Sequence, residues 1–148
     1  MTMTVGGGGA FSTQSFILPQ ESMLEVKKKK QELLIGIPKE VSFQENRIAL
    51  VPDSVAVLVN NGHEVMVETG AGNNANFTDT DYGEAGARIV YTQREVYTAD
   101  LILKIAPPSE AEVELMHDKQ TLFSVLQMNM QKKEFFEKLT KKKVTAVA

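Results

Sequence analysis

Two basic side chains in this sequence follow apolar segments of the kind that form buried strands. Arg47 lies ten residues beyond the apolar run 33–37, in the loop that follows it, and Lys104 comes directly after the run 101–103. A guanidinium can hold a carboxylate through two parallel hydrogen bonds, and an ammonium can donate to a carbonyl oxygen. A lysine that ends a buried strand must also reach water or an anion. Together these two cations are suited to binding a small oxo acid.

The elements that would position these cations are short apolar runs alternating with helical patterns. The runs cover residues 33–37, 64–68, 89–90, 101–103, 122–126 and 144–147. Runs that are apolar throughout are typical of parallel strands buried on both faces. We therefore predict an α/β fold, an open parallel sheet with helices on both faces. Ligands of such sheets bind beyond the carboxyl ends of the strands, so Arg47 and Lys104 should lie at one edge.

The predicted helices are bounded by recognisable start and stop signals. Pro52 suits the first turn of a helix, and Gly62 is suited to ending it. A helix over residues 79–87 is introduced by Thr78. Capping-box spacing predicts two more helix starts, and apolar side chains mark one face of a last helix. These signals are Thr92 with Glu95, Ser109 with Glu112, and Phe135, Phe136 and Leu139.

Composition limits the class of protein. The chain has 148 residues, 43% of them hydrophobic and 24% charged, as in a soluble globular domain. We expect residues 1–30 to form a flexible extension, with Gly6–Gly9 and Lys27–Lys30, and residues 31–148 to form one domain. The formal charge of −3 argues against a nucleic-acid partner. The lack of cysteine and of a long apolar run fits a cytoplasmic protein.

Other candidate sites are weaker. The segment 70–75 fits the pattern G-x-G-x-x-A of dinucleotide-binding loops, but the residues directly after it are poor helix starters, the next helical pattern begins only near Asp79, and no acidic residue ends the next strand. We predict an ordinary turn there. His63 and His117 fall in a turn and at a helix end, away from the predicted site, so structural roles are expected. No spacing of histidines or carboxylates suggests a metal site.

An ordered series of motifs resembles the alanine dehydrogenase and pyridine nucleotide transhydrogenase family. The motifs are Ile35–Glu40, Glu45–Pro52, Asn61–Val65, Glu68–Gly72, Phe77–Asp79 and Ala99–Lys104. The similarity runs from Leu33 to Ala148, and ordered agreement of this length is more specific than any one motif. The resemblance implies the substrate domain of a two-domain enzyme, truncated before a downstream Rossmann domain that binds NAD. The last apolar run reaches Ala148 without a cap, which also suggests a fragment.

The resemblance also implies residue roles. In the family's dehydrogenases the positions of Arg47 and Lys104 hold the carboxylate and the carbonyl oxygen of pyruvate or alanine, and L-alanine is reversibly deaminated to pyruvate and ammonia. Gln127 stands in the place of a family histidine that assists proton transfer. Glutamine cannot act as a general acid near neutral pH, so another group carries the proton or the reaction is a related one.

Two alternatives remain open. The run Lys104–Ser109 is similar to that of the transhydrogenase alpha subunit, whose corresponding domain binds NAD(H) and works with a membrane subunit. The second alternative is that the chain is a non-catalytic domain for small-molecule binding or for assembly. In the dehydrogenase reading the partners are a 2-oxo acid or amino acid and further copies of the full-length protein, and the fragment alone is inactive. Replacing Lys104 with methionine is then expected to lower turnover with little effect on folding.

Overall fold

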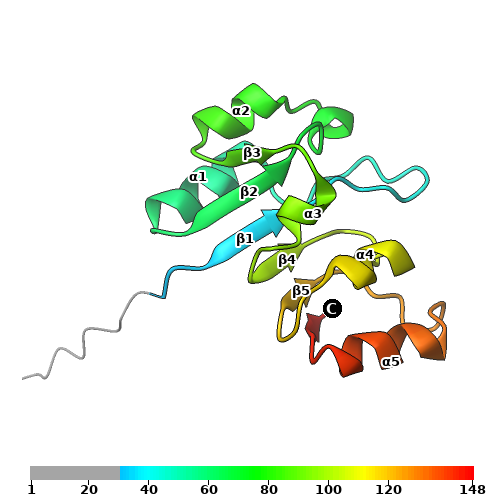
Figure 1. Ribbon diagram of the computed structural model, residues 1–148. Coiled ribbons are helices and arrows are strands. Elements are labelled where there is room, and N and C mark those ends of the chain that lie inside the picture. The colour runs from blue at the N-terminus through cyan, green and yellow to red at the C-terminus, as the bar shows by residue number, and fades with distance from the viewer. Residues whose placement is uncertain (1–30) are drawn as a thin grey trace, which may run out of the picture.

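The computed structural model describes residues 31–148, and the predicted extension over residues 1–30 lies outside the described part. Six parallel strands form one sheet in the order β3-β2-β1-β4-β5-β6, which confirms the predicted open parallel sheet (Figure 1). The strands are β1 (Leu34–Ile37), β2 (Glu64–Glu68), β3 (Arg88–Val90), β4 (Leu101–Leu103), β5 (Thr121–Phe123) and β6 (Thr145–Val147).

The strand order reverses between β1 and β4. The chain moves outward from β1 to β3, returns to β4 beside β1, and moves outward again to β6. At this switch point Gly36 pairs with Ile102. A Cβ at Gly36 would lie 2.7 Å from the Val96 carbonyl oxygen, so only glycine lets this part of the chain approach β1 so closely. The carboxyl edge between β1 and β4 is where sheets of this order bind their ligands.

Five α-helices connect the strands, and their starts agree with the predicted signals. They are α1 (Pro52–Asn60), α2 (Asp79–Glu84), α3 (Gln93–Val96), α4 (Glu110–Leu115) and α5 (Lys133–Lys141). Thr78, Thr92 and Ser109 each form the reciprocal bonds of a capping box. The helix predicted over residues 79–87 ends earlier, at Glu84, because Gly86 adopts a φ of 90° that turns the chain into β3. Within the described residues no helix is long and apolar enough to span a membrane.

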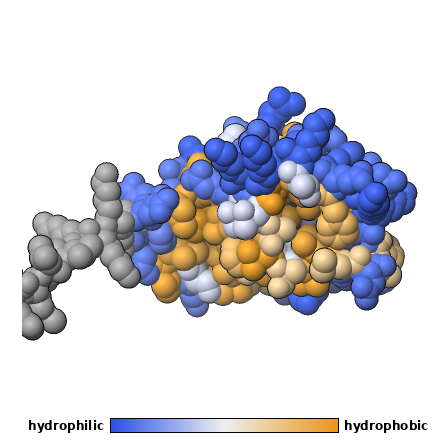
Figure 2. Space-filling view, turned by 90° about the horizontal axis from the view of Figure 1, so that it is seen from below, coloured by the Kyte–Doolittle hydropathy of each residue, from blue (hydrophilic) through white to orange (hydrophobic). Residues whose placement is uncertain are grey.

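Helices lie on both faces of the sheet, as predicted, but they cover the faces unequally. Helices α3, α4 and α5 pack in one core cluster on one face of the sheet, and α1 and α2 pack in a second cluster on the opposite face (Figure 1). On the α1 side, Phe123 of β5 and Val147 of β6 remain 42% and 40% exposed. On the face shown in Figure 2, hydrophobic residues gather over the lower middle and hydrophilic ones lie along the top.

The fifth strand is shorter than predicted. The sequence pattern suggests a strand over residues 122–126, but β5 ends at Phe123. Beyond it the Ser124 hydroxyl donates to the Ala106 carbonyl oxygen over 2.9 Å, and Leu126 is buried in the core under α5. Only part of this stretch is therefore core: Leu126 is buried, whereas Val125 is 57% exposed, and the Ser124 amide still donates to the Val147 carbonyl oxygen at 3.1 Å.

Candidate functional site

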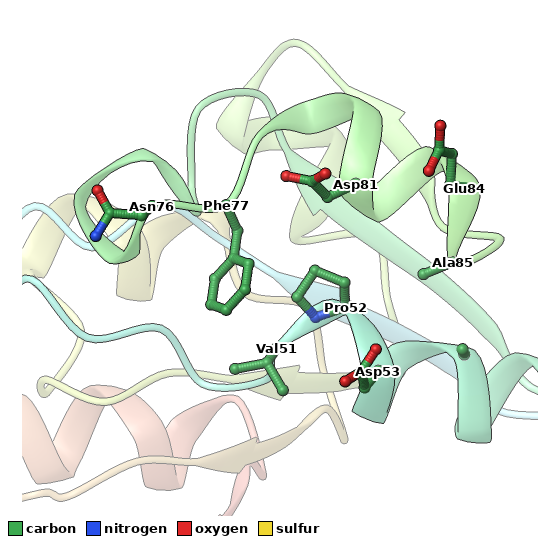
Figure 3. A pocket seen from close by; sticks show the side chains of 9 residues that line it. Val51, Pro52, Asp53, Asn76, Phe77, Asp81, Glu84 and Ala85 are labelled. Carbon is green, nitrogen blue, oxygen red and sulfur yellow. The ribbon is translucent and has the colours of Figure 1, made fainter.

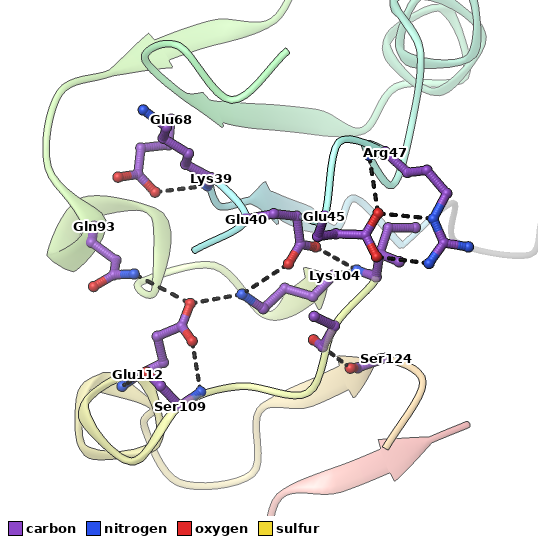
Figure 4. Close-up of polar contacts among 12 residues, drawn as sticks. Lys39, Glu40, Glu45, Arg47, Glu68, Gln93, Lys104, Ser109, Glu112 and Ser124 are labelled. Carbon is purple, nitrogen blue, oxygen red and sulfur yellow. Dashed lines mark hydrogen bonds and ion pairs between the residues drawn. The ribbon is translucent and has the colours of Figure 1, made fainter. Parts of the chain in front are cut away.

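The carboxyl edge of the sheet carries both predicted cations. Arg47 lies in the β1–α1 loop (residues 38–51), and Lys104 opens the β4–α4 loop (residues 104–109). The two loops are joined by Glu40, which accepts a hydrogen bond from the Ile105 amide and forms an ion pair with Lys104. Figure 4 shows Glu40 and Glu45 lying between the two cations. The structure thus places Arg47 and Lys104 at one edge of the molecule.

Lys104 is enclosed in a buried ionic cluster. Its Nζ lies 2.8 Å from Glu112 Oε1 and 3.3 Å from Glu40 Oε2, and its side chain is 0% exposed. The closer contact is a hydrogen bond, whereas Glu40 Oε2 lacks hydrogen-bond geometry. The anion that a lysine at the end of a buried strand must reach is therefore supplied by the chain itself.

Glu112 is held by more than the lysine. Its Oε1 accepts from the Tyr97 hydroxyl at 3.1 Å and from Gln93 Nε2 at 3.2 Å, and its Oε2 accepts from the Ser109 amide at 2.7 Å. Burial, and after it the charge of Glu112, raise the pKa of Tyr97, so this phenol stays protonated and donates. The carboxylate is thus fixed by α3, α4 and the end of β4 together.

Arg47 has the opposite environment. Its Nε donates to Glu45 Oε1 over 2.8 Å and its Nη2 to Glu45 Oε2 over 2.7 Å. The Arg47 side chain is 73% exposed, compared with 14% for Glu45. The hydrogen bonds from Arg47 lower the pKa of Glu45 to about 2, and the same pairing raises the pKa of Arg47. Both groups are therefore charged at neutral pH.

The expectation that both cations open onto one pocket needs correction. Arg47 faces solvent, but Lys104 lies behind Glu40 and Glu112 and has no exposed side-chain surface. Sequence reasoning recognised Glu112 only as half of a capping box with Ser109, and it assigned no role to Glu40. Buried lysines recruit buried carboxylates, but the sequence alone does not show which carboxylates come within reach.

Gln127, the third predicted site residue, follows β5 at the same carboxyl edge. It is exposed, its φ is 45°, and its carbonyl oxygen accepts from the Met130 amide at 2.8 Å. Within residues 31–148 no hydrogen bond links its side chain to Arg47 or Lys104. That Gln127 takes the place of the family histidine at this site stays a prediction.

The segment 70–75 is a turn, as predicted. The Gly70 amide and the Thr69 hydroxyl both donate to the Asp79 carboxylate, over 2.8 and 2.6 Å. The Gly70 amide is therefore not free to bind a phosphate. The only helical turn within the segment is the short 3-10 helix Asn73–Ala75.

The two histidines have structural partners, as expected. The Leu33 amide donates to His63 Nδ1 over 3.3 Å, and His117 Nε2 lies 3.0 Å from the Ala99 carbonyl oxygen. His63 directly precedes β2, and Ala99 lies just before β4. Both histidines thus lie at the edge formed by the amino ends of the strands, opposite the carboxyl edge at which Arg47 lies.

A hollow of about 650 Å³ lies between the start of α1 and α2 (Figure 3). Its polar lining includes Asp53, Asp81 and Glu84, and neither Arg47 nor Lys104 lines it. The carboxylate of Asp81 belongs to the capping box of α2, and Thr78 lowers its pKa through hydrogen bonds. Three carboxylates repel an anionic oxo acid, so this hollow does not suit that ligand.

Comparison with known proteins adds to this geometry. Residues 36–148 match the family model described as alanine dehydrogenase/PNT, N-terminal domain. Alanine dehydrogenase of Staphylococcus epidermidis is 41% identical over 114 residues, which is 77% of this chain and 30% of that protein. Alanine dehydrogenase 2 of Staphylococcus aureus is 40% identical over the same shares. The chain thus spans about a third of the length of these relatives.

Two solved structures are also similar. One is an L-alanine dehydrogenase with a TM-score of 0.75 and 40% identity, covering 78% of this chain and 32% of that one. The other is a transhydrogenase from Sinorhizobium meliloti with a TM-score of 0.71 and 30% identity, covering 78% and 34%.

Proposed function

Because this chain belongs to the alanine dehydrogenase and pyridine nucleotide transhydrogenase family, whose members are oxidoreductases, we propose that it is the substrate-binding part of an NAD-dependent alanine dehydrogenase. The complete enzyme would convert L-alanine, NAD and water into pyruvate, ammonium, NADH and a proton, and the reverse. The chain covers 30% of the relative's length, so the full activity needs segments beyond it, and this part alone does not turn over.

The observation that supports this proposal most strongly is the exposed guanidinium of Arg47 at the carboxyl edge of the sheet. It is fully charged, 73% exposed and positioned where open α/β sheets bind ligands. A guanidinium suits the planar carboxylate shared by alanine and pyruvate. We therefore assign Arg47 as the group that holds the substrate carboxylate.

Lys104 has a conditional part in this proposal. An ammonium has three N–H donors, and Glu112 and Glu40 face two of them. Because the Lys104 side chain is 0% exposed, a substrate cannot reach its third donor directly. The β1–α1 loop must first move Glu40 aside before Lys104 can donate to the substrate carbonyl oxygen. That loop also carries Arg47, so one movement would bring both cations to the substrate.

NAD is assigned to a downstream domain. The one glycine pattern in residues 31–148 that resembles a dinucleotide loop does not fit the cofactor, because Asp79 occupies the Gly70 amide. When bound, NAD would accept the hydride from alanine. The full-length protein is proposed to be a cytoplasmic homo-oligomer, as expected from the resemblance.

The test is Arg47→Ala in the full-length protein, with pyruvate-dependent NADH oxidation in the presence of ammonium as the assay. The Michaelis constant for pyruvate should rise about ten- to hundredfold, because a charge-assisted bidentate contact is lost. Arg88→Ala is the matched control, since Arg88 also pairs with a glutamate at 3.3 Å but lies at the amino end of β3. Unchanged pyruvate kinetics in Arg47→Ala would remove this assignment.

Transhydrogenase is a second candidate. The similarity to the Sinorhizobium meliloti structure and the glutamine in place of the family histidine both favour it. In that case the full-length protein would pass hydride from NADH to NADP without pyruvate, together with a membrane subunit. A third, non-enzymatic alternative is a small-molecule binding or assembly domain, which would bind pyruvate with neither activity. Assaying both reactions, and pyruvate binding, in one preparation separates the three.

A further inference from the structure

We propose that Glu45 is a positioning residue for Arg47, one that fixes the guanidinium by its side edge and leaves its end edge free for the substrate carboxylate. The inference rests on the proposed function, because it needs Arg47 to bind that carboxylate. The observations that support it are the geometry of the ion pair and the unequal burial of its two members.

The ion pair uses only part of the guanidinium. Glu45 accepts from Nε and from one hydrogen of Nη2, at 2.8 and 2.7 Å. A guanidinium has five N–H donors, so both hydrogens of Nη1 and one of Nη2 remain. Within residues 31–148 no hydrogen bond engages Nη1. The Nη1–Nη2 edge can hold a second carboxylate in the same two-bond geometry.

Glu45 is also the better-fixed member of the pair. Its side chain is 14% exposed, and its Oε1 accepts from the Arg47 backbone amide at 3.0 Å as well as from the side chain. The turn before it is closed by the Glu45 amide, which donates to the Ser42 carbonyl oxygen at 3.2 Å. One carboxylate therefore anchors both the backbone and the side chain of Arg47.

Fixing Arg47 in advance favours binding. A long side chain that is free in solution loses rotamer freedom when a ligand immobilises it, and a side chain already held loses less. Glu40 is the other acid whose charge reaches Arg47, but it has no hydrogen bond to the guanidinium and is turned to Lys104. The orientation of the free edge therefore depends on Glu45.

A competing role for Glu45 predicts the opposite result. If Glu45 occupied the groups that the substrate needs, its removal would tighten pyruvate binding. The two edges of the guanidinium are separate, so we expect removal to weaken binding instead.

The experiment is Glu45→Gln in the full-length protein, alone and combined with Arg47→Ala. Glutamine keeps the size of the side chain but has a single acceptor oxygen and no charge, so it cannot form the two parallel charge-assisted bonds that Glu45 makes to Arg47. The Michaelis constant for pyruvate should rise about two- to tenfold, the cost of ordering one long side chain, while the turnover number stays unchanged. In the Arg47→Ala background Glu45→Gln should have no further effect. Glu64→Gln, which removes the partner of Arg88, is the matched control.

The outcomes separate the two proposals. A lower Michaelis constant, an unchanged one, or an effect that adds to that of Arg47→Ala overturns the positioning role while leaving Arg47 as the carboxylate group. If Arg47→Ala itself leaves pyruvate kinetics unchanged, the proposed function fails and the positioning role fails with it. The unfolding midpoint of each variant shows that a change in the Michaelis constant does not come from misfolding.

Discussion

Lys104 and Arg47 are both cations paired with glutamates at the same edge of the sheet, but Lys104 is buried and Arg47 is exposed to solvent. The Lys104 side chain is 0% exposed and that of Arg47 is 73% exposed. The carboxylate of Glu112, the closer partner of Lys104, accepts from Gln93 of α3, from the Ser109 amide before α4 and from Lys104 itself. Within residues 31–148 the carboxylate of Glu45 accepts only from Arg47, two residues along the chain. The first cluster joins distant parts of the chain, and the second organises one loop.

The difference in burial decides what each pair does. A buried ion pair is not strongly stabilising compared with an apolar pair, but losing one member leaves a charge without solvent or partner. An exposed pair adds little to stability because water and salt screen it. We conclude that Lys104 is required for the fold whatever else it does, and that Arg47 is available to a ligand.

The largest expected effect is that of Lys104→Met on stability. The variant leaves Glu112 and Glu40 buried without their cation, which should lower the free energy of unfolding by about 3–5 kcal/mol in urea denaturation. This replaces the expectation from sequence that the substitution acts on turnover with little effect on folding. Lys133→Met is the matched control, because Lys133 pairs with Glu137 at 3.2 Å while 87% exposed. Equal stability of the two variants would mean that the buried cluster does not differ from a surface pair.

A smaller loss is expected for Glu40→Gln. Glutamine can still accept from the Ile105 amide, and Glu112 still pairs with Lys104. The buried side chain of Glu40 loses its charge and its ion pair, so unfolding should become easier by about 1–3 kcal/mol. If the loss equals that of Lys104→Met, then Glu40, despite its longer 3.3 Å contact, is the main partner of the lysine.

The smallest expected effect is the loss of the exposed Arg47–Glu45 ion pair at low pH. The pKa of Glu45 is lowered from 4.5 to about 2, so ionised Glu45 is favoured in the folded state. Its contribution is fully present above pH 4.5 and is lost as the pH falls through about 2. Carbon-13 detected titration of the Glu45 carboxyl should give a midpoint near 2, and Arg47→Ala should return it towards 4.5. A wild-type midpoint already at the ordinary value would show that the two side chains do not pair in solution.

Much of the fold follows from local sequence. Apolar runs predicted all six strands, and Thr78, Thr92 and Ser109 marked helix starts, because strand burial and helix capping depend on residues close together in the chain. The same local rules placed Arg47 and Lys104 beyond the ends of strands. They were less reliable at residues 124–126, where β5 has already ended: Leu126 packs into the core, whereas Val125 is 57% exposed.

The alternation of strands and helices, and hence the edge at which the two cations lie, can be derived from local patterns in the sequence. The surroundings of these cations depend on the three-dimensional fold. Glu40 reaches Lys104 from the β1–α1 loop, 64 residues away in the chain, and Glu112 reaches it from α4, 8 residues away; together they close it off from water. Burial and pairing depend on which groups the fold brings together across such separations, and no local pattern in the sequence records that distance.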